Sequence, residues 1–369
     1  MSDFSEKRLV IACGGTGGHL FPGIAVAESW TRQGGEALLL ISSKQIDALA
    51  AEGYSHLRFE KMPSVAMPGL FSLKMPGFLI GFLRSLRDCR RLLREFKADA
   101  VLGMGGFTST APLLAGRLAG LPTFIHESNA IPGKANRLNA RFSIAVLIGF
   151  QQCAPCFGMG KRVEVVGTPL RPAVARKPTR EEGIAYFGLQ AGKRTLMIMG
   201  GSQGARRINE LVAASLPEFT DSGIQILHIS GPADYDLVKP AYDNNPEAGV
   251  LRDFCGEVQY AYAVADLAVC RSGAATLTEL AYYEIPSVLI PYPYAADDHQ
   301  TANAEIFSLP GAAELWRQGD LNEDNFAGKM IDLMNDTGRL ERMKATAATL
   351  VVPDASRRVC EVVAEAINR

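Results

Sequence analysis

The feature that most limits the fold is a series of short apolar runs, separated by stretches with helical composition, along the 369 residues of the chain. These runs are apolar throughout rather than alternating, which is typical of strands covered on both faces. Strands that alternate with helices predict parallel sheets joined by right-handed crossovers, an α/β fold. The runs that predict strands cover residues 9–13, 37–42, 100–104, 123–126, 144–148, 195–199, 224–230, 267–271 and 287–291.

The two halves of the chain repeat one arrangement, in which a first strand runs into a glycine turn and then a helix. The turn covers residues 14–18 in the first half and 200–204 in the second. The proline-rich stretch between the halves predicts a linker. We therefore expect a first domain over 1–166, a linker over 167–178 and a second domain over 179–352. A last helix over 353–369 packs either on the second domain or back on the first.

Composition excludes several classes of protein. Lys and Arg number 38 against 39 Asp and Glu, so the chain lacks the basic field of a nucleic-acid-binding protein. Seven scattered cysteines fit reduced thiols in a cytoplasm better than a disulfide scaffold. The most apolar stretch, 75–83, contains Pro and Gly and is far shorter than the ~20 residues of a spanning helix. We expect a soluble protein that can still touch a membrane.

Three glycine turns follow predicted strands, at residues 14–18, 103–109 and 200–204. A glycine turn at a helix start lets backbone N–H groups approach an anion. In open α/β sheets, ligands bind at the carboxyl ends of the strands, where these turns lie. The turns lack the third glycine of a dinucleotide fingerprint, and no Walker A sequence is present. Nicotinamide chemistry and ATP hydrolysis are therefore disfavoured.

The segment 272–279 continues this pattern in the second half. Ser272 can cap a helix, and Gly273 lets a phosphate approach the helix N-terminus. Glu279 lies about two turns further on, where a carboxylate suits a pair of sugar hydroxyls better than a phosphate. The polar residues 297–300 and Asn303 begin a further helix and suit hydroxyl recognition.

With these motifs, the chain resembles the MurG family of peptidoglycan N-acetylglucosaminyltransferases. The resemblance rests on the glycine turns together with Ser-Gly-x-x-Thr-x-x-Glu at 272–279, His-Glu-Ser-Asn at 126–129 and Asp-His-Gln at 298–300. It covers nearly all of residues 8–369. It implies a GT-B glycosyltransferase, with two Rossmann-like domains whose parallel sheets face a cleft. Glu284 departs from the family pattern, which often has Gly at this turn.

The resemblance also implies the substrates and their contacts. The donor would be UDP-GlcNAc, and the acceptor a polyprenyl-diphosphate-linked muramoylpentapeptide. Donor contacts are implied for Ser202 and Arg171 at the diphosphate, the backbone near Cys255 at uracil, Gly273, Ala274, Ala275 and Thr276 at the phosphates, Glu279 at the ribose and Gln300 at the sugar. From the first domain, Thr16, Gly17, Gly18 and Asn129 would approach the donor, and Gly15, Gly105 and Gly106 would receive the acceptor diphosphate.

Transfer with inversion needs a base for the acceptor hydroxyl. His19 is the best candidate because it lies in a glycine turn and an unperturbed histidine has a pKa close to neutral pH, although it could instead cap the helix or bind the acceptor diphosphate. We expect no metal and no cofactor. Asp234-Tyr-Asp236 matches D-x-D, but its polar surroundings predict a surface position. Cys153 and Cys156 form a C-x-x-C without a second pair, so a zinc or redox role is disfavoured.

Two alternatives stay open at this point: a UDP-GlcNAc epimerase on the same fold, and a nucleotide-sugar-binding subunit without catalysis. If the acceptor is a polyprenyl lipid, the first domain must meet an anionic membrane surface, at the cytoplasmic face of the cell membrane. The apolar stretch 65–82 and the helix after it suit this contact, because Arg84, Arg87, Arg91 and Arg94 share one face. Leu83, Leu86, Leu93 and Phe96 are expected to line another face.

Overall fold

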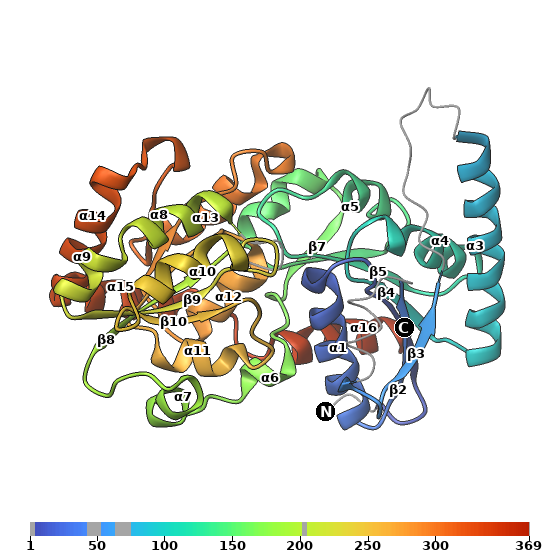
Figure 1. The fold of residues 1–369 in the computed structure, drawn as a ribbon. Helices are drawn as coiled ribbons and strands as arrows, with labels where there is room; N and C mark the ends of the chain where they lie inside the picture. The colour runs from blue at the N-terminus through green and yellow to red at the C-terminus, as the bar shows by residue number, and fades with distance from the viewer. Residues whose placement is uncertain (1–3, 43–52, 63–74, 201–204, 369) are drawn as a thin grey trace. The chain divides into compact units, whose positions relative to one another are not determined.

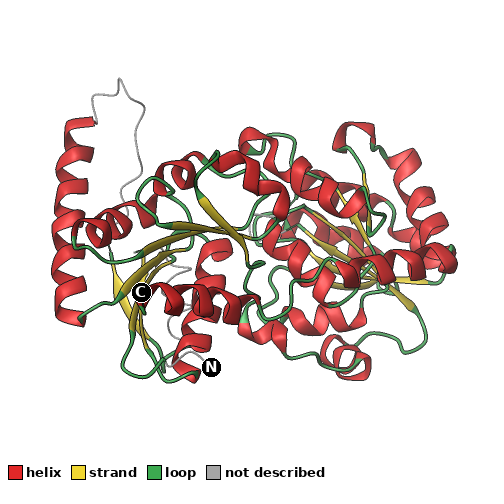
Figure 2. Cartoon of the chain, turned by 180° about the vertical axis from the view of Figure 1, so that it is seen from behind, coloured by secondary structure: helices red, strands yellow, loops and turns green. Residues whose placement is uncertain are grey.

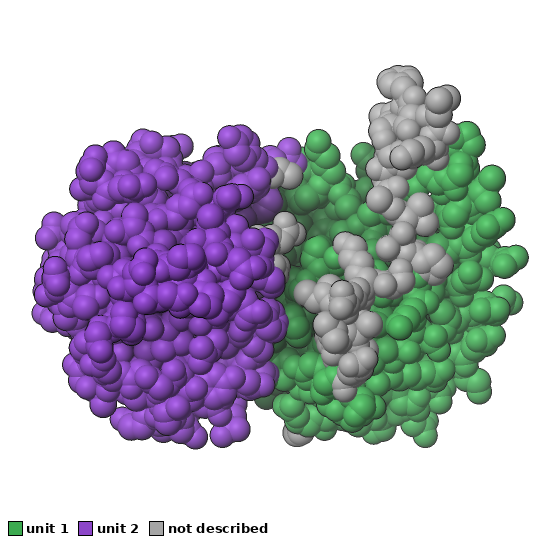
Figure 3. Space-filling model, in the orientation of Figure 1, with its two compact units in different colours: residues 1–172, 352–369 green, residues 173–351 purple. Residues whose placement is uncertain are grey.

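The computed structural model describes residues 4–42, 53–62, 75–200 and 205–368. The chain divides into two compact units, Met1–Pro172 with Val352–Arg369, and Ala173–Val351 (Figure 3). In each unit, helices lie outside a central layer of strands (Figure 2). The predicted α/β fold class with two parallel sheets is confirmed.

Unit 1 contains a seven-stranded parallel sheet in the order β3-β2-β1-β4-β5-β6-β7 (Figure 1). Its strands are β1 (Arg8–Ala12), β2 (Glu36–Ile41), β3 (Arg58–Lys61), β4 (Ala100–Gly103), β5 (Thr123–Glu127), β6 (Ala145–Ile148) and β7 (Arg162–Val165). Its helices are α1 (Gly17–Arg32), α3 (Met75–Phe96), α4 (Thr110–Leu118), α5 (Lys134–Asn139) and α16 (Ala355–Ile367), with the 3₁₀ helices η1 (Phe107–Ser109) and η2 (Gln151–Phe157).

Alternate residues of the central strands supply two hydrophobic clusters, one on each face of this sheet. Leu9 and Ile11 join the cluster under α1 and α16, whereas Val10 and Ala12 join the cluster under α3 and α4. Successive side chains of a strand point to opposite faces, so a strand buried on both faces must be apolar at every position. The C-terminal helix α16 belongs to unit 1, and its Cys360 thiol donates to the Val26 carbonyl of α1 at 3.7 Å.

Unit 2 contains a six-stranded parallel sheet in the order β10-β9-β8-β11-β12-β13. Its strands are β8 (Arg194–Met199), β9 (Ile224–Ile229), β10 (Gly249–Arg252), β11 (Leu267–Cys270), β12 (Ser287–Leu289) and β13 (Ala313–Leu315). Its helices are α7 (Arg180–Phe187), α8 (Arg206–Ala214), α9 (Leu216–Asp221), α10 (Tyr235–Asn244), α11 (Val258–Val264), α12 (Ala274–Tyr282), α13 (His299–Ser308), α14 (Glu323–Asn335) and α15 (Thr337–Thr349), with the 3₁₀ helices η3 (Ala296–Asp298) and η4 (Gln318–Asp320). The short helix α6 (Pro172–Ala175) leads into it.

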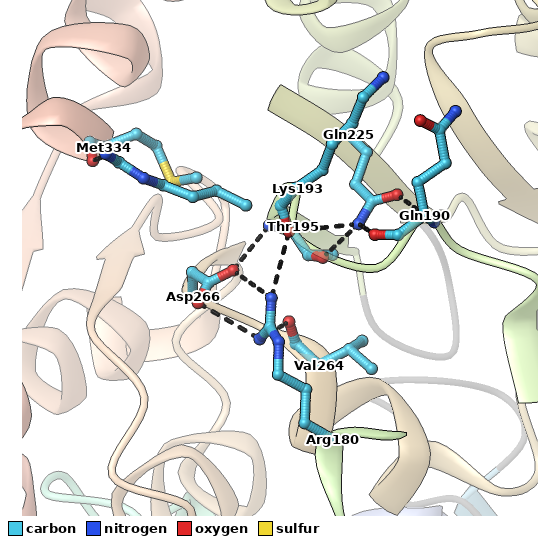
Figure 4. A network of polar contacts seen from close by, with 9 residues as sticks. Arg180, Gln190, Lys193, Thr195, Gln225, Val264, Asp266 and Met334 are labelled. Atoms are coloured by element: carbon cyan, nitrogen blue, oxygen red, sulfur yellow. Dashed lines mark hydrogen bonds and ion pairs between the residues drawn. The ribbon is translucent and has the colours of Figure 1, made fainter. Parts of the chain in front are cut away.

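A polar network fixes the start of unit 2 to its sheet (Figure 4). Arg180, at the start of α7, bonds both carboxylate oxygens of Asp266 at 3.2 and 2.8 Å. Asp266 also accepts from the backbone N–H of Thr195 in β8 at 2.7 Å. Gln225, on β9, donates to the Thr195 hydroxyl at 3.1 Å and to the Gln190 carbonyl at 3.0 Å. A bidentate Arg–carboxylate pair adds geometric specificity, so α7 is held in one place against β8.

All nine strands predicted from apolar runs are present, each within two residues of its predicted ends. The strands that the apolar pattern missed are β3, β7, β10 and β13, and these are the edge strands of the two sheets. Most of their residues are half-buried or exposed, unlike those of the central strands. An edge strand has a neighbour on one side only, so its sequence need not be apolar throughout.

Glu284 occupies the turn at which α12 ends, with a φ of 58°. Its N–H donates to the Ala281 carbonyl at 2.9 Å, and the N–H of Ile285 donates to the Leu280 carbonyl at 2.9 Å. This is a Schellman motif, whose left-handed residue is usually Gly. The departure from Gly noted in the sequence therefore leaves the turn intact but places a side chain where the backbone is strained.

Replacing Glu284 with Gly is expected to raise the free energy of unfolding of unit 2 by about 1 kcal/mol, because Gly carries no Cβ penalty at positive φ. Urea-induced unfolding, monitored by hydrogen exchange of the β12 amides, measures this change in the free energy of unfolding. Glu341→Gly is the matched control: Glu341 is exposed inside α15, where Gly should destabilise by about 1 kcal/mol. Equal effects of the two substitutions would contradict the assignment of strain to Glu284.

Each unit buries a neutral histidine. In unit 1, Nε2 of His126 donates to the Gly167 carbonyl at 2.9 Å. In unit 2, Nε2 of His228 donates to Asn209 Oδ1 and its Nδ1 accepts from the Tyr242 hydroxyl, both at 3.0 Å. Burial lowers the pKa of His126 to about 4 and that of His228 to about 3. Both rings are therefore uncharged in the folded protein near neutral pH.

We expect both units to lose stability as the pH falls from about 6.5 towards 4, because an unfolded histidine has a pKa near 6.5 and binds the proton that the folded one rejects. For His126 the loss amounts to roughly 3 kcal/mol at the acid end of this window, at ~1.36 kcal/mol per pKa unit. Urea unfolding at a series of pH values measures the slope. In His126→Gln the slope should become shallower; an unchanged slope would show that other groups cause it.

Candidate active site

In unit 1 the candidate site lies where the strand order reverses, between β1 and β4. The turn 14–18 follows β1, and the turn 103–109 follows β4, which pairs with β1 in the sheet. The two turns are in contact, since the Thr108 hydroxyl donates to the Gly14 carbonyl at 2.7 Å. Helix α1 begins at Gly17 after Thr16, whose side chain makes no capping hydrogen bond. The first N–H groups of α1 thus lie at the edge of the sheet where ligands bind in open α/β folds.

His19, in the first turn of α1, lies against the second glycine turn. Its Nδ1 is 3.2 Å from the Thr16 hydroxyl oxygen. A Cβ atom on Gly105 would lie 2.7 Å from His19 Nε2, and one on Gly106 would lie 3.3 Å from Cε1. Both glycines have positive φ, so backbone conformation and space together require Gly at these positions. The structure therefore brings together Thr16, His19, Gly105 and Gly106, for which the resemblance implied separate roles at the donor, as base and at the acceptor diphosphate.

A buried carboxylate that sequence reasoning left without a role organises the neighbouring loop. Glu127, 3% exposed at the end of β5, accepts from the backbone N–H and the side-chain amide of Asn129, both at 2.9 Å. It also accepts from the N–H of Gly133 at 3.1 Å and from Asn136 Nδ2 at 2.8 Å. Asn136 in turn accepts from the N–H of Gly106 at 3.1 Å. One carboxylate thus joins the loop of Asn129 to the glycine turn beside His19.

In unit 2 the corresponding reversal lies between β8 and β11. The turn after β8 contains Ser202, which lies outside the described residues, so the structure does not test its predicted role. After β11, helix α12 begins at Ala274 with Gly273 as its N-cap and with no side-chain cap. The predicted phosphate contacts, Gly273 to Thr276, form this uncapped helix start. Its free N–H groups and the positive end of the helix dipole suit a phosphate.

Two expectations about this region are wrong. Ser272 does not cap α12: it is buried, and its hydroxyl donates to the Gln300 carbonyl at 2.7 Å. Asn303 is also fully buried and donates to the Ser272 carbonyl at 3.0 Å, so it does not offer its amide to a sugar hydroxyl. Both side chains instead fasten α13 to the loop after β11. The side chain of Gln300 accepts from the N–H of Tyr292 at 2.9 Å.

Glu279 lies on the buried face of α12, 3% exposed. The hydroxyl of Tyr262, on α11, donates to its Oε2 at 2.6 Å. The sequence analysis assigned no role to Tyr262, because no motif includes it and its contact with Glu279 joins two different helices. Two further predicted donor contacts are described. Cys255 is half-buried in the loop after β10. Arg171 belongs to unit 1, and its guanidinium lies 5.3 Å from the centre of the Phe21 ring.

The structure describes both motifs that were set aside. The predicted surface position is correct for Asp236, which is exposed, but wrong for Asp234, which is 7% exposed and accepts from Asn209 Nδ2 at 3.0 Å. Asp234 starts α10 and fixes that helix to α8. Cys153 is buried and Cys156 exposed on η2. Within the described ranges, His, Cys, Asp and Glu side chains form no group of three or more that could hold a metal ion.

Both halves of the chain match models of one family. The description "Glycosyltransferase family 28 N-terminal domain" matches residues 9–148, and "Glycosyltransferase family 28 C-terminal domain" matches residues 195–359. The crystal structure of MurG from Acinetobacter baumannii superposes with a TM-score of 0.75 at 27% identity, and the match covers 97% of this chain and 99% of that one. A UDP-glucosyltransferase from Polygonum tinctorium shares the fold at 14% identity, with a TM-score of 0.74 over 99% of both chains.

Curated relatives are similar over almost their whole length. A UDP-N-acetylglucosamine--N-acetylmuramyl-(pentapeptide) pyrophosphoryl-undecaprenol N-acetylglucosamine transferase from Halothermothrix orenii is 35% identical over 96% of this chain and 98% of its own. A protein of the same name from Shewanella denitrificans is 36% identical over 97% of this chain and 96% of its own. The chain therefore belongs to glycosyltransferase family 28, and within it to the MurG family of N-acetylglucosaminyltransferases.

Proposed function

We propose that this protein transfers GlcNAc from UDP-GlcNAc, with inversion, to the muramoyl 4-hydroxyl of undecaprenyl-diphospho-muramoylpentapeptide. The observation that carries the proposal is the identity of about a third to relatives of that activity, over nearly the whole of both chains. The relatives give no support to the alternative of a UDP-GlcNAc epimerase. A binding subunit without catalysis is disfavoured because a candidate base, His19, lies against Gly105 and Gly106.

The donor half of the reaction suits unit 2. The uncapped start of α12 at Gly273 offers N–H groups to the diphosphate, and Glu279 on the same helix accepts from the ribose hydroxyls. In the displacement, the bond from C1 of GlcNAc to the β-phosphate oxygen breaks, and its electron pair leaves with UDP. Helix N–H groups and the charge of Arg171 would stabilise that oxygen. We propose that these N–H groups and this guanidinium take the place of a metal ion at the leaving diphosphate.

The acceptor half suits unit 1. The acceptor hydroxyl oxygen forms the new bond to C1, and its proton goes to His19. If Nδ1 of His19 donates to the Thr16 hydroxyl, then Nε2 carries the lone pair that accepts this proton. Gly105 and Gly106 lie against the edge of the His19 ring that carries Nε2 and Cε1. Because glycine has no side chain, the main-chain groups of these two residues would receive the acceptor diphosphate.

The membrane-facing surface of unit 1 is proposed to be the outer side of α3. Helix α3 buries Ser85, Cys89, Leu93 and Phe96. Leu83 was expected on the same side as Leu93, but it lies two residues before Ser85 and so on the opposite side of the helix, 63% exposed. It shares that side with Leu79 and Ile80, which are 51% and 53% exposed.

The outer side of α3 is thus apolar in its first half and basic in its second. Arg84, Arg87, Arg90, Arg91 and Arg94 are all exposed there. This pattern suits a helix that inserts apolar side chains between headgroups while its arginines meet anionic lipid. None of the described helices has the length and hydropathy needed to cross a bilayer. We therefore propose a peripheral protein at the cytoplasmic face of the cell membrane.

Labelled UDP-GlcNAc tests the activity. With a polyprenyl-diphospho-muramoylpentapeptide acceptor, the label should move to the lipid, and without it the label should stay in UDP-GlcNAc. Activity should survive EDTA. Conversion of UDP-GlcNAc to its epimer without acceptor would contradict the proposal, and loss of activity in EDTA that Mg²⁺ restores would contradict the metal-free mechanism.

His19→Ala is expected to lower kcat by ~10²–10⁴-fold while leaving donor binding unchanged, because a general base acts in the transition state. Steady-state kinetics with both substrates, and UDP titration, separate the two effects. His56→Ala is the control, since the His56 side chain is 61% exposed and outside the site. A loss confined to the acceptor KM would make His19 an anchor for the acceptor diphosphate instead.

Binding to vesicles should rise with their content of anionic lipid and fall with salt, because each Arg near an anionic leaflet contributes about 1 kcal/mol. Replacing Arg84, Arg87 and Arg91 with Gln should weaken co-sedimentation strongly. The control replaces Arg317, Arg342 and Arg358, which are exposed elsewhere, and changes the net charge equally. If both triple variants sediment alike, the docking surface lies elsewhere.

A further inference from the structure

The carboxylate proposed to bind the ribose is itself held by a buried phenol. Tyr262 is 2% exposed and Glu279 is 3% exposed, and the bond from the Tyr262 hydroxyl to Glu279 Oε2 is 2.6 Å long. A hydrogen bond to an ionised acceptor at this distance is stronger than one between neutral groups. The two side chains come from different helices, α11 and α12, so this bond also fixes where the carboxylate lies relative to the start of α12.

Tyr262 is held in turn by Tyr283, which ends α12. The two rings lie 5.2 Å apart between centres, at an angle of 44°. The Tyr283 hydroxyl donates to backbone carbonyls of the segment that leads into unit 2, at 3.1 Å to Val174 and 2.8 Å to Arg176. Burial raises the pKa of Tyr283, so this hydroxyl keeps its proton over the working pH range. The ring of Tyr262 therefore packs against a ring that is itself held in place, and this contact helps to direct the Tyr262 hydroxyl towards Glu279.

We infer that Tyr262 is a positioning residue for ribose recognition, acting through Glu279. The inference rests on the proposed role of Glu279 at the ribose. The terminal torsion of a glutamate side chain is broad, so an unheld carboxylate samples many orientations. Two neighbouring hydroxyls of a ribose need both carboxylate oxygens in one plane and one place. By binding Oε2 from the side of α11, Tyr262 selects that orientation before the donor arrives, and thus lowers the ordering cost of binding.

A positioning role and a purely structural role of Tyr262 would affect different sets of ligands. A structural loss weakens every uridine nucleotide equally, because all use the same pocket. A positioning loss weakens only ligands that carry the ribose hydroxyls. UDP and 2′,3′-dideoxy-UDP differ in those hydroxyls alone, so the ratio of their dissociation constants measures ribose recognition and cancels changes in overall stability.

The experiment measures this ratio by calorimetry for the full-length wild type and its variants. Tyr262→Phe keeps the ring and removes the hydroxyl; it should weaken UDP about tenfold, as expected for a lost hydrogen bond to a charged group, and leave dideoxy-UDP unchanged. Tyr283→Phe is the matched control, since it also removes one hydroxyl but keeps the ring against Tyr262, and its ratio should equal that of wild type. In a Glu279→Gln background, Tyr262→Phe should change the ratio no further.

Two results overturn the inference in distinguishable ways. If wild type prefers UDP but Tyr262→Phe weakens both ligands equally, or neither, the positioning role is wrong and the role of Glu279 stands. If wild type binds both ligands equally, the ribose assignment of Glu279 is wrong and this inference falls with it. The transfer assay with labelled UDP-GlcNAc is independent of both results.

Discussion

The arrangement of both units depends on the topology of a parallel sheet. The carboxyl ends of all its strands lie at the same edge, and the strand order changes direction between two neighbouring central strands. The reversal lies between β1 and β4 in unit 1, and between β8 and β11 in unit 2. At such a point the loops diverge to opposite faces and leave the following helix starts exposed to a ligand. The uncapped starts of α1 and α12 lie at these points. The same physical device therefore serves a lipid diphosphate in one unit and a nucleotide diphosphate in the other, under the proposed function.

Around these helix starts, buried carboxylates determine the shape of the loops. An ionised carboxylate taken out of water costs much free energy unless hydrogen bonds replace its hydration. Glu127 meets this requirement with donors from Asn129, Gly133 and Asn136, and so fixes the loop that follows β5. In unit 2, the Glu279 carboxylate accepts a hydrogen bond from the Tyr262 hydroxyl. In both cases hydrogen bonds to a buried carboxylate help to position residues of the proposed site.

The end of α12 joins several of these features. Glu284 takes the strained left-handed position of the Schellman turn, directly after two tyrosines. Tyr282 and Tyr283 donate to backbone carbonyls of the segment 174–176, and the Lys177 ammonium lies 4.3 Å from the centre of the Tyr282 ring. The turn that directs these rings thus fastens the entry of the chain into unit 2 to the helix that carries Glu279.

The sequence by itself determined the central sheets and the glycine turns, because a strand covered on both faces must be apolar at every position and a backbone at positive φ favours Gly. It did not reveal the edge strands β3, β7, β10 and β13, whose half-exposed residues follow no such rule. Only the tertiary structure decided that Asp234 and Asn303 are buried, that Glu127 organises a loop, and that Tyr262 holds Glu279. The partners of Asp234, Asn303 and Tyr262 come from other elements of the fold, and those of Glu127 come from the loop and helix that follow it. A polar residue of the same type is stable both in water and in a buried network whose hydrogen bonds are all made, so its type alone does not predict its burial.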